Sequence, residues 1–325
     1  GGGVLLAGVT VGAVLLVRRL PRHPWLATAC AVLLLLAVVR PAPLTRIVTG
    51  WPPPGWAFAM CDVGQGDATV LATGDGSAVV VDVGPDPVPA DQCLRALGVT
   101  RIPLLLLTHF HADHVAGLAG VLRGRAVGVI ETATFEEPPE QARFVRRTAA
   151  RAGVPVVPVE PGERRSVGGL SWQALWPLPP PTMTPDGPND ASVTLLVRAG
   201  GLTLLLPGDL EPPAQQALLR AHPELPPVDV LKVAHHGSAH QDPALLRAIR
   251  PRLALISAGR GNPYGHPAPS TVALLVSSGA RVLRTDTDGA IAVTGKGSGG
   301  EDSDGDGAES REGSELVAVP LGRSP

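Results

Sequence analysis

The residues of this chain with the clearest chemical potential form one short stretch, Thr108 to His114, which contains three histidines and an aspartate. Neutral imidazoles and carboxylates are the ligands that zinc and related divalent metals prefer. An unbroken apolar run, Ile102 to Leu107, precedes the stretch and predicts a buried strand. Polar groups are costly at the end of a buried strand unless they bind something. The stretch therefore predicts a metal site; a histidine-rich surface loop is the alternative.

The spacing of these ligands predicts two metal ions. His109 and His111 lie two residues apart on an extended segment, so they point the same way and can share one ion. Asp113 and His114 lie past the turn and can reach a second ion beside the first. Asp113 is also a candidate catalytic residue. We expect two divalent cations here, zinc or manganese.

Two later apolar segments also end in polar residues. The segment Leu206 to Asp209 presents a carboxylate that could bridge two ions, although an ordinary turn aspartate has the same pattern. The segment Val230 to Val233 leads to His235 and His236, of which one can bind metal while the other hydrogen-bonds substrate. We predict Asp209 and His235 as metal ligands.

Further polar residues could act on a substrate at this metal site. His236 and His266 could protonate a leaving oxygen or contact an anionic group such as a phosphate, so both are candidate catalytic residues. Ser238 and Lys232 could bind a phosphate. The alternatives are a surface turn for His266 and a structural role for Lys232.

Length and composition indicate the elements that position these residues. The 325 residues suffice for one domain of about 200 to 250 residues with additional segments. A net charge of −2 excludes a global basic field, and 39 glycines, 35 prolines and 3% aromatic residues favour short strands and turns. We predict strands at residues 57–63, 68–72, 78–83, 102–107, 127–130, 154–159, 170–176, 192–197 and 202–206, and helices at 91–97, 115–123 and 138–152.

The N-terminal segment differs from the rest of the chain. Two apolar runs, Val4 to Val17 and Pro24 to Val39, flank the basic cluster Arg18-Arg19-Arg22. This pattern predicts a transmembrane helical hairpin with a cytoplasmic loop, and hence an extracytoplasmic location for the rest of the chain. A buried helical pair in a soluble protein is the alternative.

These patterns define four segments. We expect residues 1–46 to be the end of a truncated transmembrane region and residues 47–56 to be a proline-rich linker. We expect residues 57–294 to form the domain that carries the metal site. We expect residues 295–325 to be a disordered acidic tail rich in glycine and serine, in which Glu315 to Leu321 could add an edge strand.

The three cysteines form no zinc-finger spacing. We interpret Cys61 and Cys93 as small buried hydrophobic residues. A disulfide between them is the alternative if the domain lies outside the cell.

The ordered set of motifs resembles a known family. The stretch Thr108 to His114, followed by Pro207-Gly-Asp209 and His235-His-Gly-Ser238, is similar to the metallo-β-lactamase superfamily. The remaining motifs and the two apolar runs resemble the C-terminal part of ComEC-type competence proteins: Asp62-Val-Gly-Gln-Gly-Asp67, Asn189-Asp-x-Ser192, Leu231 to Ser238 and Asn262-Pro-Tyr-Gly-His-Pro267.

The resemblance implies an α/β (α+β) fold, an αββα sandwich with the site at the strand ends between two sheets. It also implies a metal-dependent nuclease attached to a membrane channel that passes single-stranded DNA inward. Partners would be DNA, the membrane and other channel components. Many superfamily enzymes use one more histidine, but none occurs here between His114 and His222; Asn189 or Asp190 falls near that place. An oxygen ligand or water there would weaken the binding of one ion and favour manganese as much as zinc. Asn189 is also a substrate-binding candidate. His111 stands where many ComEC relatives carry aspartate.

Three functions are compatible with these patterns. The first is a nuclease that degrades the strand that is not imported. The second is an extracytoplasmic metallo-phosphodiesterase that acts on small or wall-linked phosphoesters. The third is a non-catalytic DNA-binding or gating module, which metal content would separate from the first two.

Overall fold

The computed structural model describes Trp25, Thr28, Ala29, Val32 and residues 50–178, 185–296 and 315–322. The chain divides into two compact units, Gly1–Val48 and Thr49–Pro325. The two apolar runs predicted to span a membrane lie outside these described residues, except at four positions, as does the predicted disorder of residues 297–314. Within the described residues, no helix has the length and apolar character needed to cross a membrane.

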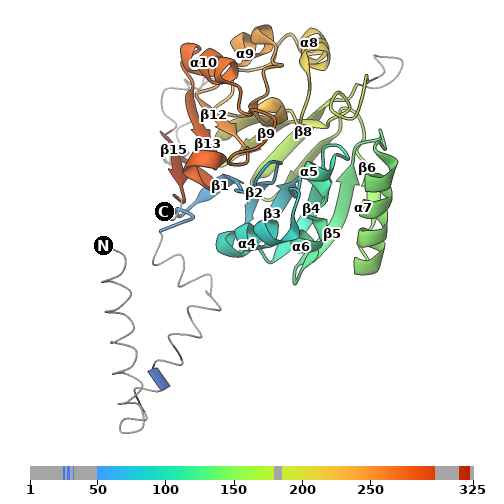
Figure 1. Cartoon of the computed structure of the whole chain (residues 1–325), viewed down its shortest axis with the longest axis vertical. Helices are drawn as coiled ribbons and strands as arrows, with labels where there is room; N and C mark the ends of the chain where they lie inside the picture. Colours follow the sequence, from blue (N-terminus) through green and yellow to red (C-terminus); the bar gives the residue numbers. More distant parts are fainter. Residues whose placement is uncertain are drawn as a thin grey trace, which may run out of the picture. The chain divides into compact units, whose positions relative to one another are not determined.

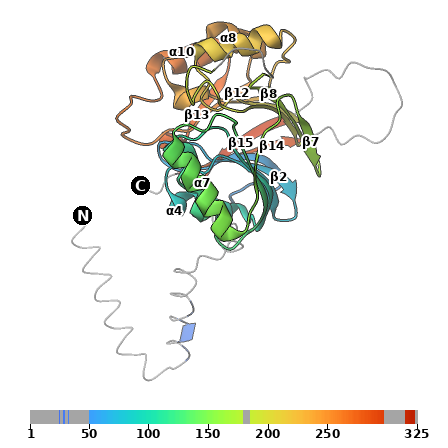
Figure 2. The ribbon, with the colours of Figure 1, turned by 90° about the vertical axis from the view of Figure 1, so that its right-hand side faces the viewer.

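The second unit consists of two sheets packed face to face between two layers of helices (Figure 1, Figure 2). The first sheet has the strand order β15-β14-β1-β2-β3-β4-β5-β6. Its strands are β1 Trp56–Met60, β2 Thr69–Gly74, β3 Ser77–Val81, β4 Arg101–Leu107, β5 Ala126–Thr132, β6 Val156–Pro158, β14 Ile291–Lys296 and β15 Glu315–Pro320.

The second sheet has the order β13-β12-β11-β10-β9-β8-β7. Its strands are β7 Arg164–Val167, β8 Leu170–Trp176, β9 Thr194–Ala199, β10 Leu202–Leu206, β11 Val230–Lys232, β12 Leu253–Ile256 and β13 Arg281–Arg284. Parallel pairs β3/β4 and β10/β11 occur in the middle of the two sheets.

The helices cover the outer faces of both sheets. Those on the first sheet are α4, α6 and α7, and those on the second are α8, α9 and α10 (Figure 1). The bounds are α4 Pro87–Leu97, α5 Ala112–Val115, α6 Leu118–Leu122, α7 Pro139–Ala152, α8 Pro212–Ala221, the 3₁₀ helix η2 Ala234–Gly237, α9 Pro243–Ile249, α10 Pro269–Ser277 and α11 Thr285–Asp288. The αββα sandwich that the family resemblance implies is therefore confirmed.

Three buried clusters fill the interfaces between the layers. Strand β4 shows why its sequence is continuously apolar: Leu105 and Leu107 pack toward the helices, whereas Leu104 and Leu106 pack between the sheets. A strand buried on both faces needs apolar residues at every position. The strand thus provides a rigid base for the polar residues that follow it.

The nine predicted strands are present with shifted ends, but one predicted helix is wrong in detail. The helix expected at 115–123 is two short helices, α5 and α6, separated by Gly117. A Cβ on Gly117 would lie 2.0 Å from the carbonyl oxygen of Val83, so the chain approaches the β3 end too closely for any larger residue. Strand β7, helix α8 and the elements from η2 to β14 were not predicted.

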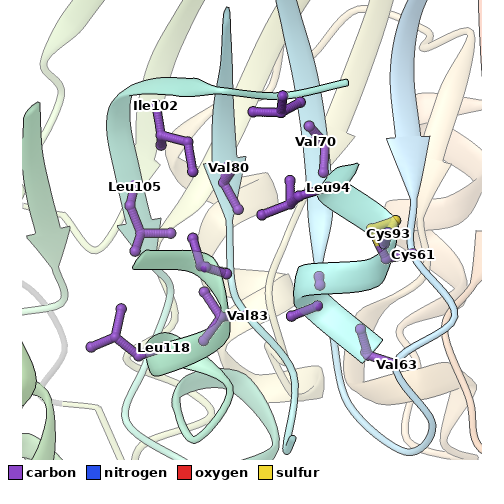
Figure 3. Packing of buried hydrophobic residues seen from close by; sticks show 14 of the residues in the cluster. Cys61, Val63, Val70, Val80, Val83, Cys93, Leu94, Ile102, Leu105 and Leu118 are labelled. Carbon is purple, nitrogen blue, oxygen red and sulfur yellow. A yellow bond between two sulfur atoms is a disulfide. The ribbon is translucent and has the colours of Figure 1, made fainter. Parts of the chain in front are cut away.

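Cys61 and Cys93 form a disulfide, with Cα atoms 5.8 Å apart. Our interpretation of the two residues as unbonded hydrophobic residues is therefore wrong. The bond joins the segment after β1 to helix α4, beside Leu94 in the first cluster (Figure 3). Sequence spacing alone does not show that a strand end and a helix face meet here.

The strand expected near Glu315 is present as β15 and pairs antiparallel with β14. Trp51, in the predicted linker, is only 2% exposed, and its indole Nε1 donates a hydrogen bond to the carbonyl oxygen of Val319 at 3.1 Å. The folded domain therefore includes residues on both sides of the predicted 57–294 range.

Candidate metal centre

The ends of four strands meet at one edge of the sandwich. Because β3 runs parallel to β4, and β10 to β11, the residues that follow these strands gather at the same edge. Asp82 follows β3, the stretch from Thr108 follows β4, Asp209 follows β10, and the histidine pair follows β11. The sequence pattern of apolar strand and polar end therefore becomes a spatial cluster.

The centre of this site is a buried cluster that we call the four-residue cluster: Asp67, His114, Asp209 and His236. One ligand atom from each residue lies within 4.8 Å of all the others. The Nε2 atoms of His114 and His236 lie 3.1 Å and 3.3 Å from Oδ2 of Asp209. Both imidazoles thus face one carboxylate oxygen.

The other predicted ligands surround this cluster. Oδ2 of Asp113 lies 3.2 Å from Nε2 of His236. Nε2 of His109 lies 3.0 Å from Nδ1 of His111, and the rings of His109 and His114 have centroids 4.1 Å apart. The structure therefore brings together every metal ligand predicted from the Thr108–His114 stretch.

The histidine pair is arranged differently from our prediction. His235 and His236 both have left-handed backbone conformations, with φ of 48° and 52°. Nδ1 of His235 lies 3.3 Å from Oε1 of Glu211, at the side of the site, and its side chain is 23% exposed. His236 instead joins the cluster, so the geometry favours His236 as the metal ligand of the pair.

Asp67 is a site residue that sequence reasoning did not single out, although its motif was noted. The chain reaches it through Gly66, whose φ is 146° and whose Cβ, if present, would lie 2.3 Å from the carbonyl oxygen of Asp113. The amide of Asp67 donates a hydrogen bond to the same carbonyl at 3.2 Å. Glycine is required because the two backbone segments are in direct contact.

Asp82 was also missed as a site residue. Its Oδ1 accepts a hydrogen bond from the Thr108 amide and its Oδ2 one from the Thr108 hydroxyl, each at 2.8 Å. Oδ2 also lies 2.9 Å from Nδ1 of His114. A carboxylate on the second ring nitrogen fixes the orientation of a ligand histidine. Its place after β3 was the signal that could have revealed it.

The amine of Lys232 is surrounded by oxygen atoms of the protein. It donates to the carbonyl oxygen of Gly208 at 2.7 Å, lies 3.2 Å from Oδ1 of Asp209 and forms an ion pair with Asp67. The residue is 3% exposed. These contacts favour a positioning role, in which Lys232 neutralises two carboxylates, over the predicted contact with phosphate.

The remaining predicted residues lie at the border of the site. The Ser238 hydroxyl accepts a hydrogen bond from the His240 amide at 3.3 Å, and Ser238 is 2% exposed. Nδ2 of Asn189 donates to Glu211 at 3.2 Å. The ring of His266 is half-buried and stacks against His236, with centroids 6.4 Å apart. His266 thus has a ring contact with a member of the cluster.

The charges of the cluster are balanced internally. Burial opposes the charge on His114, but the surrounding carboxylates, Asp209 first, raise the pKa of His114 well above its ordinary value. Burial likewise opposes the charge on His236, and Asp209 raises its pKa. Burial alone would raise the pKa of Asp209, but His114, His236 and Lys232 lower it well below its usual range.

This donor set fits divalent metal ions. Two imidazoles and two carboxylates converge in a buried space, where only cationic groups can compensate the carboxylates. Burial and the neighbouring His114 lower the pKa of His109 well below its ordinary value, which keeps the ring neutral and able to bind metal. Mixed nitrogen and oxygen donors suit zinc and its neighbours in the first transition series.

The family model of the metallo-β-lactamase superfamily matches residues 61–260. The chain therefore belongs to the metallo-β-lactamase superfamily, whose fold the αββα sandwich reproduces.

Its curated relatives include competence proteins. The chain is 29% identical over 322 residues to ComE operon protein 3 of Bacillus subtilis (strain 168), with 88% of this chain and 41% of that protein aligned. It is 29% identical over 299 residues to competence protein ComA of Neisseria gonorrhoeae, with 89% and 38% aligned. It is 30% identical over 249 residues to recombination protein 2 of Haemophilus influenzae, with 74% and 29% aligned. The resemblance to ComEC-type proteins is confirmed, and the chain spans about two fifths or less of these relatives.

Similar solved structures include Zn(2+)-bound PqqB from Methylobacterium extorquens, at 16% identity, a TM-score of 0.43 and coverage of 67% of this chain and 84% of that one. Another is CmlA, a diiron β-hydroxylase from Streptomyces venezuelae, at 19% identity, a TM-score of 0.47 and coverage of 71% and 53%. By its family match, its curated relatives and its four-residue cluster, the chain is a metallo-β-lactamase-fold, metal-dependent hydrolase related to the ComEC-type competence proteins.

Proposed function

We propose that this chain is the nuclease domain of a DNA-uptake channel and hydrolyses phosphodiesters of the strand that is not imported. The observation that supports this proposal most strongly is the buried four-residue cluster in a chain similar to competence proteins. The partners would be double-stranded DNA as substrate, single-stranded DNA as product and the other components of the channel.

We propose further that the domain is tethered to the membrane and lies on its extracytoplasmic side. The Cys61–Cys93 disulfide supports this location, because disulfides persist in oxidising compartments and are rare in the cytosol. The basic cluster between the two N-terminal apolar runs supports the same orientation.

In this proposal His109 and His111 would hold one ion. Asp113, His114 and His236 would hold another, and the carboxylate of Asp209 would serve the same centre. Divalent ions bound there would activate water and neutralise charge on the phosphate. The positioning residues act through these ligands: Asp82 fixes the ring of His114, and Lys232 fixes the carboxylate of Asp209.

His266 is the candidate residue for protonating or contacting the leaving oxygen. Its ring lies beside His236 but outside the four-residue cluster, so it is not committed to the carboxylates. Burial, with His235 and His236 nearby, lowers the pKa of His266. A neutral imidazole there can donate one hydrogen bond to a phosphate or leaving oxygen.

The test uses the compact unit Thr49–Pro325, because the described residues of all three buried clusters lie within it. Single- and double-stranded DNA labelled at the 5′ or 3′ end is incubated with manganese, zinc or a chelator. We expect metal-dependent cleavage that Asp113→Ala and His114→Ala abolish and that the exposed control His240→Ala retains.

Two results would contradict the proposal. Bound metal without DNA cleavage would indicate a small phosphoester substrate. Absence of both metal and cleavage would indicate a binding or gating module.

A further inference from the structure

Tyr264 is the only tyrosine of the chain and lies 69% exposed beside the candidate metal centre. It belongs to the loop between β12, which ends at Ile256, and α10, which begins at Pro269. Single exposed hydrophobic residues are common on protein surfaces and need no explanation by themselves. Tyr264 differs from such residues in two respects: hydrogen bonds hold the loop that carries it, and histidine rings of the site lie next to it.

The loop that carries Tyr264 is held in one shape by the side chain of Asn262. Its Nδ2 donates to the carbonyl oxygens of Gly259, at 2.8 Å, and His266, at 2.5 Å. Its Oδ1 accepts from the amides of Tyr264, at 3.2 Å, and His266, at 3.1 Å. A side chain presented by such a loop binds with little loss of conformational entropy.

Three rings lead from the buried cluster to the surface. The centroids of His236 and His266 are 6.4 Å apart with an interplanar angle of 29°. Those of His266 and Tyr264 are 6.0 Å apart at 31°. His236 belongs to the four-residue cluster, so Tyr264 stands two rings outward from the candidate ligands. Its exposed ring is therefore within reach of a group adjoining a phosphodiester at the cluster.

We propose that Tyr264 is a stacking platform for a nucleobase next to the scissile phosphate. The proposal rests on the proposed function and names its substrate class: nucleic acid with unpaired bases at the site. Every base has an aromatic face, so stacking on a tyrosine adds affinity without strong sequence preference. A base inside a duplex is already stacked on its neighbours, so this platform would favour single strands or frayed ends.

The experiment compares two ligands with equal length and charge: oligothymidylate and an abasic oligomer with the same phosphate backbone. Binding to the unit Thr49–Pro325 is measured by fluorescence anisotropy in chelator, and cleavage is measured in parallel with manganese. The variants are Tyr264→Ala, Tyr264→Phe and the control Val276→Ala, which removes another exposed hydrophobic side chain, 57% exposed, on α10.

We expect Tyr264→Ala to weaken oligothymidylate binding about 5- to 100-fold, the range typical of one lost stacked base. The preference for oligothymidylate over the abasic oligomer should fall by the same factor. Tyr264→Phe keeps an aromatic face and should retain the wild-type preference, as should Val276→Ala. Matching circular dichroism spectra would confirm that each variant is folded.

The two proposals fail in different ways. A Tyr264→Ala protein with the wild-type preference for bases would overturn the stacking platform, even if DNA is cleaved. A wild-type protein that binds neither oligomer would overturn it as well. Binding with the predicted loss in Tyr264→Ala, but without cleavage, would support the platform and contradict the nuclease.

Discussion

At the scale of single residues, Asp82 shows how a group outside the four-residue cluster determines the geometry inside it. The carboxylate accepts hydrogen bonds from the amide and the hydroxyl of Thr108, the first residue after β4. It also contacts the ring nitrogen of His114 that faces away from Asp209. Asp82 itself has φ of 60°, an uncommon conformation for a residue other than glycine. The local strain is balanced by these three contacts.

We therefore predict that Asp82→Asn lowers metal affinity by about 10- to 100-fold, as is typical when the partner of a ligand histidine is lost. An amide can present its NH₂ group to Nδ1 of His114, which favours the wrong tautomer for metal binding through Nε2. Competition with a chromogenic chelator measures the effect. The exposed control Asp75→Asn should retain wild-type affinity, and equal affinities for all three proteins would contradict the assigned role of Asp82.

Residue types and spacing were sufficient to predict most of the site. His109, His111, Asp113, His114 and Asp209 all follow buried strands, and the structure gathers them at one edge. The choice between His235 and His236 could not be made from the sequence, because our prediction assumed that side chains alternate as in an extended strand. Both residues have left-handed conformations, and this reverses which ring faces the cluster.

At the scale of secondary-structure elements, Glu131 of β5 is a buried carboxyl group between the two sheets. It is fully buried, and its Oε1 lies 2.5 Å from Nη2 of Arg165 on β7. Burial is the main reason that its pKa is raised to about 7, and Glu163 adds to the effect while Arg165 opposes it. Strand β7 was not predicted, since its sequence is polar and exposed.

The raised pKa of Glu131 predicts a stability that depends on pH. Its ordinary value is 4.5, so the folded state holds this proton more tightly than the unfolded state. The stabilisation is full below about pH 4.5 and is lost as pH rises through about 7. We expect the free energy of unfolding to fall by about 2 kcal/mol between pH 5 and pH 8 through this group.

Denaturant titrations at the two pH values measure this change in wild type, Glu131→Gln and the exposed control Glu224→Gln. The difference between wild type and Glu131→Gln isolates Glu131 from the histidines of the metal centre, which titrate in both proteins. A pH dependence that is the same in Glu131→Gln and wild type would refute the prediction.

The Cys61–Cys93 disulfide also acts between elements, since it fixes the segment after β1 to α4. It closes a loop with a sequence separation of 32 residues. The loss of chain entropy in the unfolded state predicts a stabilisation of about 3 to 4 kcal/mol for a loop of this size. Unfolding of the oxidised protein, with and without reductant, tests this value. The double variant Cys61→Ser/Cys93→Ser should match the reduced protein and ignore reductant; equal stability of the oxidised and reduced proteins would contradict the prediction.

At the scale of the whole molecule, the strands of the sandwich could be predicted from the sequence, but the limits of the domain could not. Strands buried on both faces, such as β4, have an apolar pattern that is evident without any partner. The limits depend on contacts between distant segments, which no local pattern contains. Trp51 and Val319 are 268 residues apart in sequence and are joined by a hydrogen bond at 3.1 Å.

This contact predicts that a protein limited to residues 57–294 is less stable than one covering residues 50–322. The shorter protein loses the buried Trp51 and the whole of β15, which covers the edge of β14. Loss of a buried tryptophan alone costs about 3 to 5 kcal/mol. We expect the free energy of unfolding of the shorter protein to be lower by at least about 3 kcal/mol, with a correspondingly lower denaturation midpoint.

The shorter protein should nevertheless keep its chemistry. The four-residue cluster and His266 lie between residues 67 and 266, so metal content per folded molecule should be unchanged at low temperature. The point variant Val317→Ala, which trims a side chain 37% exposed on β15, serves as a control with intact strand pairing and should unfold near wild type. Equal midpoints for the short and long proteins would show that Trp51 and β15 add nothing to the domain, and the limits 57–294 would then be sufficient. A lower midpoint with retained metal would instead show that Trp51 and β15, at the edge of the sandwich, stabilise the fold. It would also show that the residues at the strand ends bind metal without them.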